Sequence, residues 1–107
     1  MSDAEILLRL GKAIAERREA DPSTSYVASL FAKGPNAIMG KVTEEAAETL
    51  LAAKDGDKLQ LVRETADLWF HSLVLLAWYG LGPEDVFAEL RRREGISGID
   101  EKKSRKR

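Results

Sequence analysis

The sequence predicts an all-α protein, an antiparallel helical bundle of about five helices that is completed by homodimerisation. Apolar residues recur at helical spacing along most of the 107-residue chain, no segment alternates as a strand does, and only three prolines interrupt it. A chain of this length forms one small domain with a modest core. Its composition, 44% hydrophobic and 33% charged, is that of a folded globular protein and not of a disordered one.

Two helices are expected in the first third of the chain. Residues 3–20 carry apolar side chains at helical spacing, and Asp21-Pro22 ends this segment. Ser23-Thr24-Ser25 offers cap residues for a short second helix that reaches Phe31. A turn with glycine at the helix end follows at Gly34-Pro35.

A helical hairpin is expected to form the centre of the fold. Its helices run from about Asn36 to Lys54 and from about Lys58 to Tyr79, and Asp57 caps the second. Because the connection at Asp55-Gly56-Asp57 is short, the two helices should be antiparallel neighbours. The apolar positions of the first helix form one stripe that consists of Ile38, Val42, Ala46, Thr49, Leu50 and Ala53.

The second half of the helix that ends at Tyr79 is apolar on nearly every side, and such a helix must be covered all round. A chain this small struggles to cover it alone. We therefore expect a homodimer formed through this helix, with two-fold symmetry.

The last helix is expected to begin at Pro83, with Glu84 and Asp85 complementing its N-terminal dipole, and to stop at Gly95. Residues 1–95 would then form the domain. Residues 96–107 are predicted to be a basic, irregular and flexible tail. Such a tail either contacts phosphates or stays solvated, and solvation is the more common outcome for a terminal run of charge.

The composition also excludes several classes of protein. The chain has no cysteine, which rules out disulfides and thiolate metal sites and is compatible with a reducing cytoplasm. Its longest charge-free run, residues 68–83, is shorter than the ~20 apolar residues of a membrane span. The N-terminus does not read as a signal peptide. We expect a cytoplasmic protein with no membrane and no nucleic-acid partner.

Acidic residues gather on both helices of the hairpin. Glu44, Glu45 and Glu48 lie within one turn of the first helix, and Glu64 and Asp67 lie one turn apart on the second. Both groups are at similar distances from the turn, so antiparallel pairing brings them to the same level. Carboxylates packed this closely repel one another unless they are solvated, protonated or bound to a shared cation.

Our interpretation is that these acids share a divalent metal that handles a phosphate substrate. Hard oxygen ligands without thiolates suit Mg²⁺, with Mn²⁺ possible. A water on the metal, or one oriented by a free carboxylate, could then attack a phosphorus atom while the metal offsets charge on the leaving pyrophosphate. Basic side chains that flank the acids and could meet phosphate are Lys33, Lys41, Lys54 and Arg63.

Simpler interpretations remain open for each feature. Taken alone, either acidic segment is more often a solvated surface than a site. The single histidine, His71, is more often hydrogen-bonded inside a bundle than a ligand. The position of Asp67 next to the apolar half of its helix argues against full solvation of this carboxylate, and the matched level of the two acidic groups argues for a site.

The motifs around these residues resemble the phosphoribosyl-ATP pyrophosphatase family, within the all-α, MazG-like nucleoside triphosphate pyrophosphatases. The acidic signature is Glu45-x-x-Glu48 followed by Glu64-x-x-Asp67. The narrower resemblance covers most of the chain. It extends to Ser25-Tyr26, Leu30-Phe31-Ala32-Lys33-Gly34, Lys41-Val42-x-Glu44-Glu45-Ala46-x-Glu48, Ala52-Ala53-Lys54, Ala66-Asp67-Leu68-x-x-His71, Gly80-Leu81-x-x-Glu84-Asp85-Val86 and Arg92-Arg93-x-Gly95-x-Ser97-Gly98.

The resemblance implies Mg²⁺-dependent hydrolysis of N1-(5-phosphoribosyl)-ATP to phosphoribosyl-AMP and pyrophosphate, the second step of histidine biosynthesis, by a homodimer. Its small-molecule nucleotide would bind near Tyr26 and the four basic side chains named above. The implied catalytic acids are Glu44, Glu45, Glu48, Glu64 and Asp67, of which the last four would hold the metal.

Two departures from the family pattern are visible. Thr43 stands where glycine is frequent, and Trp69-Phe70 where Leu-Tyr is common. Neither is an expected ligand, although Thr43 could alter the packing beside Glu44. Two alternatives remain: a MazG-like house-cleaning enzyme that hydrolyses non-canonical or deoxy nucleoside triphosphates, and a non-enzymatic dimeric helical module. A di-iron bundle is disfavoured, because it needs two Glu-x-x-His pairs.

Overall fold

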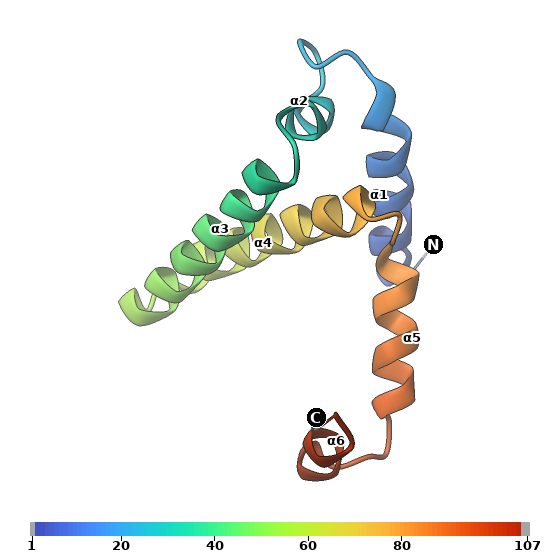
Figure 1. Cartoon of the computed structure of the whole chain (residues 1–107). Helices are drawn as coiled ribbons and strands as arrows, with labels where there is room; N and C mark the ends of the chain where they lie inside the picture. Colours follow the sequence, from blue (N-terminus) through green and yellow to red (C-terminus); the bar gives the residue numbers. More distant parts are fainter. Residues whose placement is uncertain (1, 106–107) are drawn as a thin grey trace.

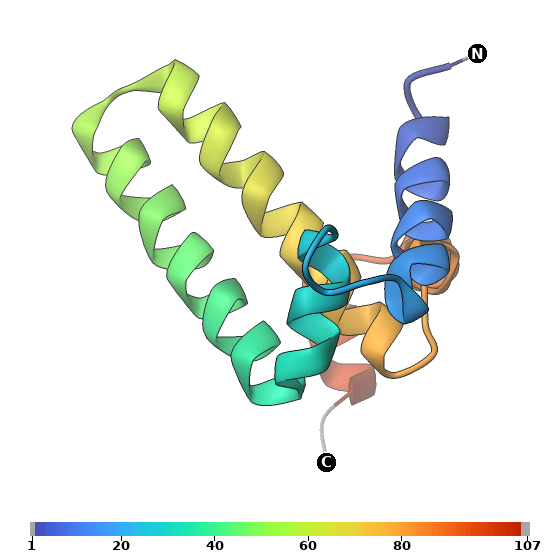
Figure 2. The ribbon, with the colours of Figure 1, turned by 90° about the horizontal axis from the view of Figure 1, so that it is seen from above.

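The computed structural model describes residues 2–105, and over this range all regular structure is helical, which confirms the all-α prediction. The elements in order are α1 (Glu5–Glu16), a 3₁₀ turn η1 (Arg17–Glu19), α2 (Tyr26–Lys33), α3 (Pro35–Asp55), α4 (Lys58–Trp78), α5 (Pro83–Arg93) and α6 (Gly98–Arg105). The long helices α3 and α4 lie side by side as an antiparallel hairpin, whereas α5 leads away from it and carries α6 at its far end (Figures 1 and 2).

The helix ends follow the expected local chemistry. The Ser25 hydroxyl caps α2 by accepting from the Ala28 N–H at 3.1 Å, and the Asp57 carboxylate caps α4 by accepting from the Gln60 N–H at 3.0 Å. Gly56 closes α3 with φ 73°, a left-handed conformation that favours glycine. Gly56 and the Asp57 cap together fix the short turn that sets α3 against α4.

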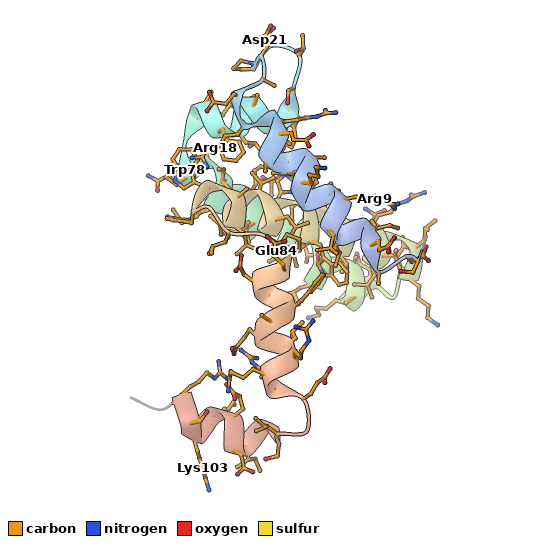
Figure 3. The ribbon with its side chains drawn as sticks, turned by 90° about the vertical axis from the view of Figure 1, so that its right-hand side faces the viewer. Arg9, Arg18, Asp21, Trp78, Glu84 and Lys103 are labelled. Atoms are coloured by element: carbon orange, nitrogen blue, oxygen red, sulfur yellow. The ribbon has the colours of Figure 1, made fainter. Side chains whose placement is uncertain are left out.

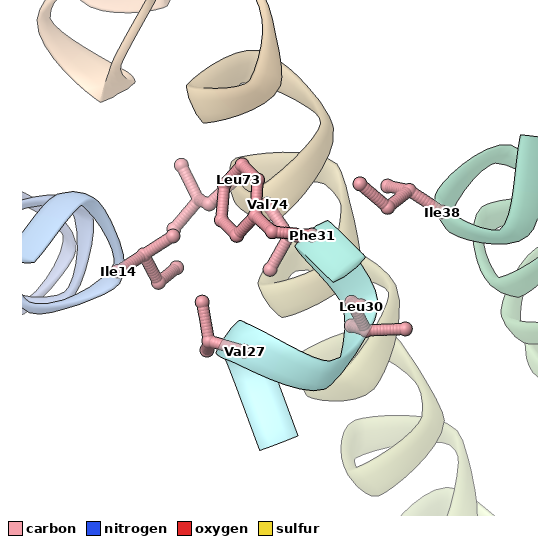
Figure 4. Close-up of a cluster of buried hydrophobic side chains, with 7 residues drawn as sticks. All are labelled: Ile14, Val27, Leu30, Phe31, Ile38, Leu73 and Val74. Carbon is pink, nitrogen blue, oxygen red and sulfur yellow. The ribbon is translucent and has the colours of Figure 1, made fainter. Parts of the chain in front are cut away.

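The core lies where the first four helices meet (Figure 4). It consists of Ile14, Val27, Leu30, Phe31, Ile38, Leu73 and Val74. Arg18 closes one side: its guanidinium lies 5.0 Å from the ring centroid of Phe31 and 5.6 Å from that of Trp78, and it donates to the Ala77 carbonyl at 3.1 Å (Figure 3). This contact joins η1 to the end of α4.

Two boundaries differ from the sequence-based expectation. The first helix ends at Glu16 and continues as a 3₁₀ turn, where the sequence predicted helix up to residue 20. The prediction of an irregular tail after residue 95 is wrong for residues 98–105, which form α6. The cause is Glu101, whose buried carboxylate forms ion pairs with two arginines. Its Oε1 lies 2.6 Å from Nη2 of Arg92 in α5 and 3.0 Å from Nε of Arg105 in α6. Residues 106–107 of that tail lie outside the described residues.

The hairpin leaves much apolar surface uncovered. Leu50 and Leu51 of α3 are 67% and 62% exposed, and Val62 of α4 is 66% exposed. Leu50 is thus exposed in the single chain although it belongs to the apolar stripe of α3, whose buried positions are Ile38, Glu45 and Ala52. On α4, Trp69 is also 56% exposed. Among residues 2–105, no helix has the length and apolar character needed to cross a bilayer.

Candidate active site

The α3–α4 hairpin brings three of the four expected metal ligands together. One carboxylate oxygen from each of Glu45, Glu48 and Glu64 lies within 4.8 Å of the others, so that they form one acidic group. Glu45 is only 6% exposed, and the other two are half-buried. The short, capped turn that connects α3 to α4 sets this register, and so the predicted meeting of the two acidic segments is confirmed.

The electrostatics of this group favour a bound cation. Hydrogen bonding to Glu64, desolvation and the nearby Glu45 carboxylate together raise the pKa of Glu48 to about 7. Oε2 of Glu45 and Oε2 of Glu64 are buried without a hydrogen-bond partner within the described residues. Buried carboxylate oxygens of this kind are costly unless a cation or a proton compensates them. A hard divalent ion with oxygen ligands would satisfy both atoms.

Asp67 is not part of the acidic group in this structure. It lies one helical turn beyond Glu64 on α4, and its side chain is exposed. The expectation that the apolar half of α4 would shield Asp67 from water is wrong for the single chain, because the neighbouring helices cover other faces of α4. Its backbone carbonyl, by contrast, accepts a hydrogen bond from Nδ1 of His71 at 2.8 Å.

Among the expected basic residues, Lys41 is the one that reaches the acids. Its ammonium lies 3.4 Å from Oε2 of Glu44 and 3.7 Å from Oε1 of Glu45. Desolvation alone would lower the pKa of Lys41, but Tyr26, Glu44 and Glu45 outweigh it, so the pKa is raised. Lys33, Lys54 and Arg63 are exposed, and none forms an ion pair with another described residue. These three side chains could contact a substrate only from the rim of the site, outside the acidic group.

Tyr26 and His71 form a contact that the linear sequence does not reveal. The Tyr26 hydroxyl oxygen lies 2.7 Å from Nε2 of His71, across 45 positions of the chain. His71 is 5% exposed and contacts Phe70 edge-on at a ring-centroid distance of 5.2 Å. The interpretation of His71 as a histidine hydrogen-bonded inside the bundle is thus confirmed, although its partner could not be named from spacing alone.

Comparisons with known proteins show which family the chain belongs to. The family model described as phosphoribosyl-ATP pyrophosphohydrolase matches residues 7–94, most of the chain. The chain belongs to this family. The match spans α1 to α5 and so includes every residue of the acidic group. The chain is therefore a hydrolase of the phosphoribosyl-ATP pyrophosphohydrolase family, which confirms the resemblance drawn from the motifs.

Several curated members of the phosphoribosyl-ATP pyrophosphohydrolase family are similar over nearly the whole length. A phosphoribosyl-ATP pyrophosphatase of Azoarcus sp. (strain BH72) is 63% identical, with 99% of both chains covered. One of Aromatoleum aromaticum is 64% identical over 98% of this chain and 97% of its own. One of Chromobacterium violaceum is 65% identical over 95% of this chain and 94% of its own. The family assignment therefore does not depend on a single local motif.

Proposed function

We propose that this chain hydrolyses N1-(5-phosphoribosyl)-ATP to phosphoribosyl-AMP and pyrophosphate, the second step of histidine biosynthesis, in the cytoplasm. The observation that carries the proposal is the acidic group of Glu45, Glu48 and Glu64 in a chain that matches phosphoribosyl-ATP pyrophosphatases end to end. The same acids would suit other nucleoside triphosphates, so the similarity to these relatives supports the choice of substrate.

Magnesium is the proposed cofactor, with Mn²⁺ as a substitute. Glu45, Glu48 and Glu64 would hold it, since they converge and two of their oxygens have no hydrogen-bond partner in the described part of the chain. Asp67, one turn along α4 from Glu64, is proposed as a further ligand. When bound, the ion would offset charge on the phosphate oxygens and acidify a water molecule.

The remaining side chains would orient the substrate and move a proton. Glu44 is exposed beside Lys41 and outside the group of three, so we propose that it accepts the proton of the attacking water. As the water oxygen bonds to the α-phosphorus, the bond from that phosphorus to the bridging oxygen breaks, and pyrophosphate leaves with this oxygen. Lys41 would meet the phosphate charge directly, while Lys33, Lys54 and Arg63 would contact the nucleotide from the rim.

A homodimer is part of the proposal. The exposed apolar side chains of the hairpin, which include Leu50, Leu51, Leu59, Val62 and Trp69, support it. A second copy of the chain would cover them by a two-fold interface, because one interaction surface then serves both subunits. Sedimentation of the purified chain would test this proposal, and a monomer at micromolar concentration would refute it.

The deciding experiment measures pyrophosphate release from phosphoribosyl-ATP with Mg²⁺ and with EDTA. We expect turnover only with metal, and an activity loss of at least roughly 100-fold in Glu48→Gln. Glu16→Gln, which changes an exposed acid on α1, should keep full activity. Turnover of ordinary deoxynucleoside triphosphates alone would instead favour a house-cleaning enzyme. The absence of turnover with any nucleotide would reject the proposal.

A further inference from the structure

A cavity of about 310 Å³ beside Tyr26 has no role in the proposed chemistry of the acids. It opens where α1, α2 and α4 meet, and none of the residues proposed to hold the metal lines it. Because Tyr26 is expected near the nucleotide, the cavity is placed to receive a part of the substrate that the acids do not bind. The described residues that line it include Ala13, Arg17, Ser25, Tyr26, Val27 and Phe70.

The cavity continues the line of the acidic group along α4. His71 follows Glu64 by seven positions, which is two turns on the same face and about 10 Å along the helix axis. The Tyr26 hydroxyl oxygen lies 2.7 Å from Nε2 of His71, and Tyr26 remains 51% exposed. An extended ligand whose phosphates sit at the acids would therefore pass Tyr26 and reach the cavity.

Arg17 supplies the charge of this cavity. Among the described residues that line it, Arg17 alone is charged. Its side chain makes no ion pair or hydrogen bond with any residue from 2 to 105, whereas the neighbouring Arg18 is held against Phe31 and Trp78 (Figure 3). A guanidinium that is committed to no partner in this part of the chain is available to an anion, and its planar fork of donors matches a phosphate.

The other walls of the cavity suit a purine and a sugar. The rings of Tyr26 and Phe70 are stacked, with centroids 6.2 Å apart and planes inclined by 22°, which gives the cavity an aromatic wall. Ser25 is 8% exposed, and its hydroxyl accepts from the Ala28 N–H at 3.1 Å. No described residue accepts the proton of this hydroxyl, so it can donate to a ribose or phosphate oxygen. The cavity thus combines an aromatic surface, a donor hydroxyl and a guanidinium.

We infer that this cavity binds the N1-phosphoribosyl group of the substrate and that Arg17 holds its 5′-phosphate. The inference rests on the proposed function, because it names the part of phosphoribosyl-ATP that lies outside the acidic group. The substrate carries phosphate at two ends, which are separated by a purine and two riboses. The triphosphate end goes to the metal, whereas the second phosphate is repelled by the carboxylates and needs a cation of its own. Ordinary nucleoside triphosphates lack this second end, so Arg17 distinguishes the two classes of substrate.

The first test measures binding without turnover. Phosphoribosyl-AMP and AMP both carry the α-phosphate, but only the former carries the N1-phosphoribosyl group. Calorimetric titration of the wild type with Mg²⁺ present should show phosphoribosyl-AMP bound more tightly by roughly tenfold to 100-fold, the worth of hydrogen bonds to a charged group. Arg17→Gln should lose most of this difference and leave the Kd of AMP unchanged. Equal affinities of the wild type for the two nucleotides, or a difference that Arg17→Gln preserves, would overturn the inference.

The second test is kinetic. Arg17→Gln should raise KM for phosphoribosyl-ATP by roughly tenfold to 100-fold with kcat nearly unchanged, because a phosphate far from the reacting bond is bound alike in the ground state and the transition state. Arg17→Lys, which keeps the charge but not the planar fork, should give an intermediate KM. Arg91→Gln changes an exposed arginine of α5 outside the cavity and should leave KM as it is. If Arg91→Gln raises KM as much as Arg17→Gln does, general attraction of anions explains the effect and the inference fails.

The inference and the proposed function fail separately. Because Arg17 is exposed and makes no printed structural contact, its replacement should leave the melting temperature unchanged, so a loss of binding reports on the ligand. If the wild type releases pyrophosphate and Arg17→Gln keeps the wild-type KM, the function stands and the inference is overturned. If the wild type releases no pyrophosphate, the proposed function is rejected. The comparison of phosphoribosyl-AMP with AMP then still decides whether the cavity binds the phosphoribosyl group.

Discussion

Glu48 of α3 and Glu64 of α4 face each other across the hairpin, and hydrogen bonding between their carboxyl groups is the main cause that raises the pKa of Glu48 to about 7. The register of the hairpin places these two carboxyl groups, which stand on different helices, within reach of each other. The same proximity makes the pair a cation site, since a divalent ion can replace the proton.

The raised pKa of Glu48 predicts how the stability of the metal-free protein depends on pH. The folded chain holds this proton more tightly than the unfolded chain, whose Glu48 has the ordinary value of 4.5. The stabilisation is therefore complete below pH 4.5 and is lost as pH rises to about 7. Melting temperatures measured in EDTA should fall over this range. In Glu48→Gln, which cannot ionise, the fall should be smaller, and identical profiles for both proteins would contradict the assignment.

Metal addition should reverse this loss of stability. A ligand that binds only the folded state at a concentration of one hundred times its Kd adds about 2.7 kcal/mol. We expect Mg²⁺ or Mn²⁺ to raise the melting temperature more at pH 8 than at pH 5.5, because the carboxyl groups must be deprotonated to bind. Glu45→Gln and Glu64→Gln should abolish the shift. An equal shift with NaCl at matched ionic strength would show screening in place of a site.

Asp67→Asn tests the proposed fourth ligand. Because Asp67 is exposed and lies outside the acidic group, its replacement should leave the metal-free melting temperature unchanged. If Asp67 swings toward the ion on binding, calorimetric titration with Mn²⁺ should show a Kd weakened by roughly tenfold to 100-fold. An unchanged Kd would restrict the ligand set to Glu45, Glu48 and Glu64. Asp55→Asn, at the exposed end of α3, is the matched control.

Two helical glycines should respond in opposite ways to substitution by alanine. A Cβ added to Gly11 of α1 would lie 2.5 Å from Cδ of Pro83, so Gly11→Ala should push α1 away from α5 and cost about 1–3 kcal/mol. A Cβ at Gly40 of α3 meets nothing within 4 Å, so Gly40→Ala should gain roughly 0.5–1 kcal/mol. Urea unfolding measures both values, and a neutral Gly11→Ala would show that α1 and α5 are not held in this packing.

Glu101→Ala should release α6 from α5. The Glu101 carboxylate is 5% exposed, and Arg92, Arg93 and Arg105 lie 2.6 Å, 3.9 Å and 3.0 Å from it. Amide hydrogen exchange across residues 98–105 should therefore accelerate, whereas the melting temperature should change little, because α6 adds no side chain to the core cluster. Lys103→Ala, at an exposed position of α6, should leave exchange as it is. If amide exchange is unchanged in Glu101→Ala, the ion pairs of Glu101 do not hold α6 against α5.

Local patterns in the sequence were enough to predict the helices and the acidic group, because both depend on short-range spacing. Apolar periodicity, together with caps such as Ser25 and Asp57, sets where the helices begin. Glu45 and Glu48 share a helix face at any packing angle, and the short turn at Gly56 forces them to meet Glu64. The family motifs lie on these same segments, which is why the resemblance and the local chemistry agree.

The packing of the helices against one another sets which side chains are covered and which distant residues meet. It left Asp67 exposed although the apolar half of α4 follows it, and it paired Tyr26 with His71 across 45 positions. It also folded the basic tail into α6 around Glu101. Such contacts depend on the angle and distance at which helices pack, and local spacing does not encode these quantities. A periodic pattern therefore fixes the face of a helix, but not the partner that the face meets.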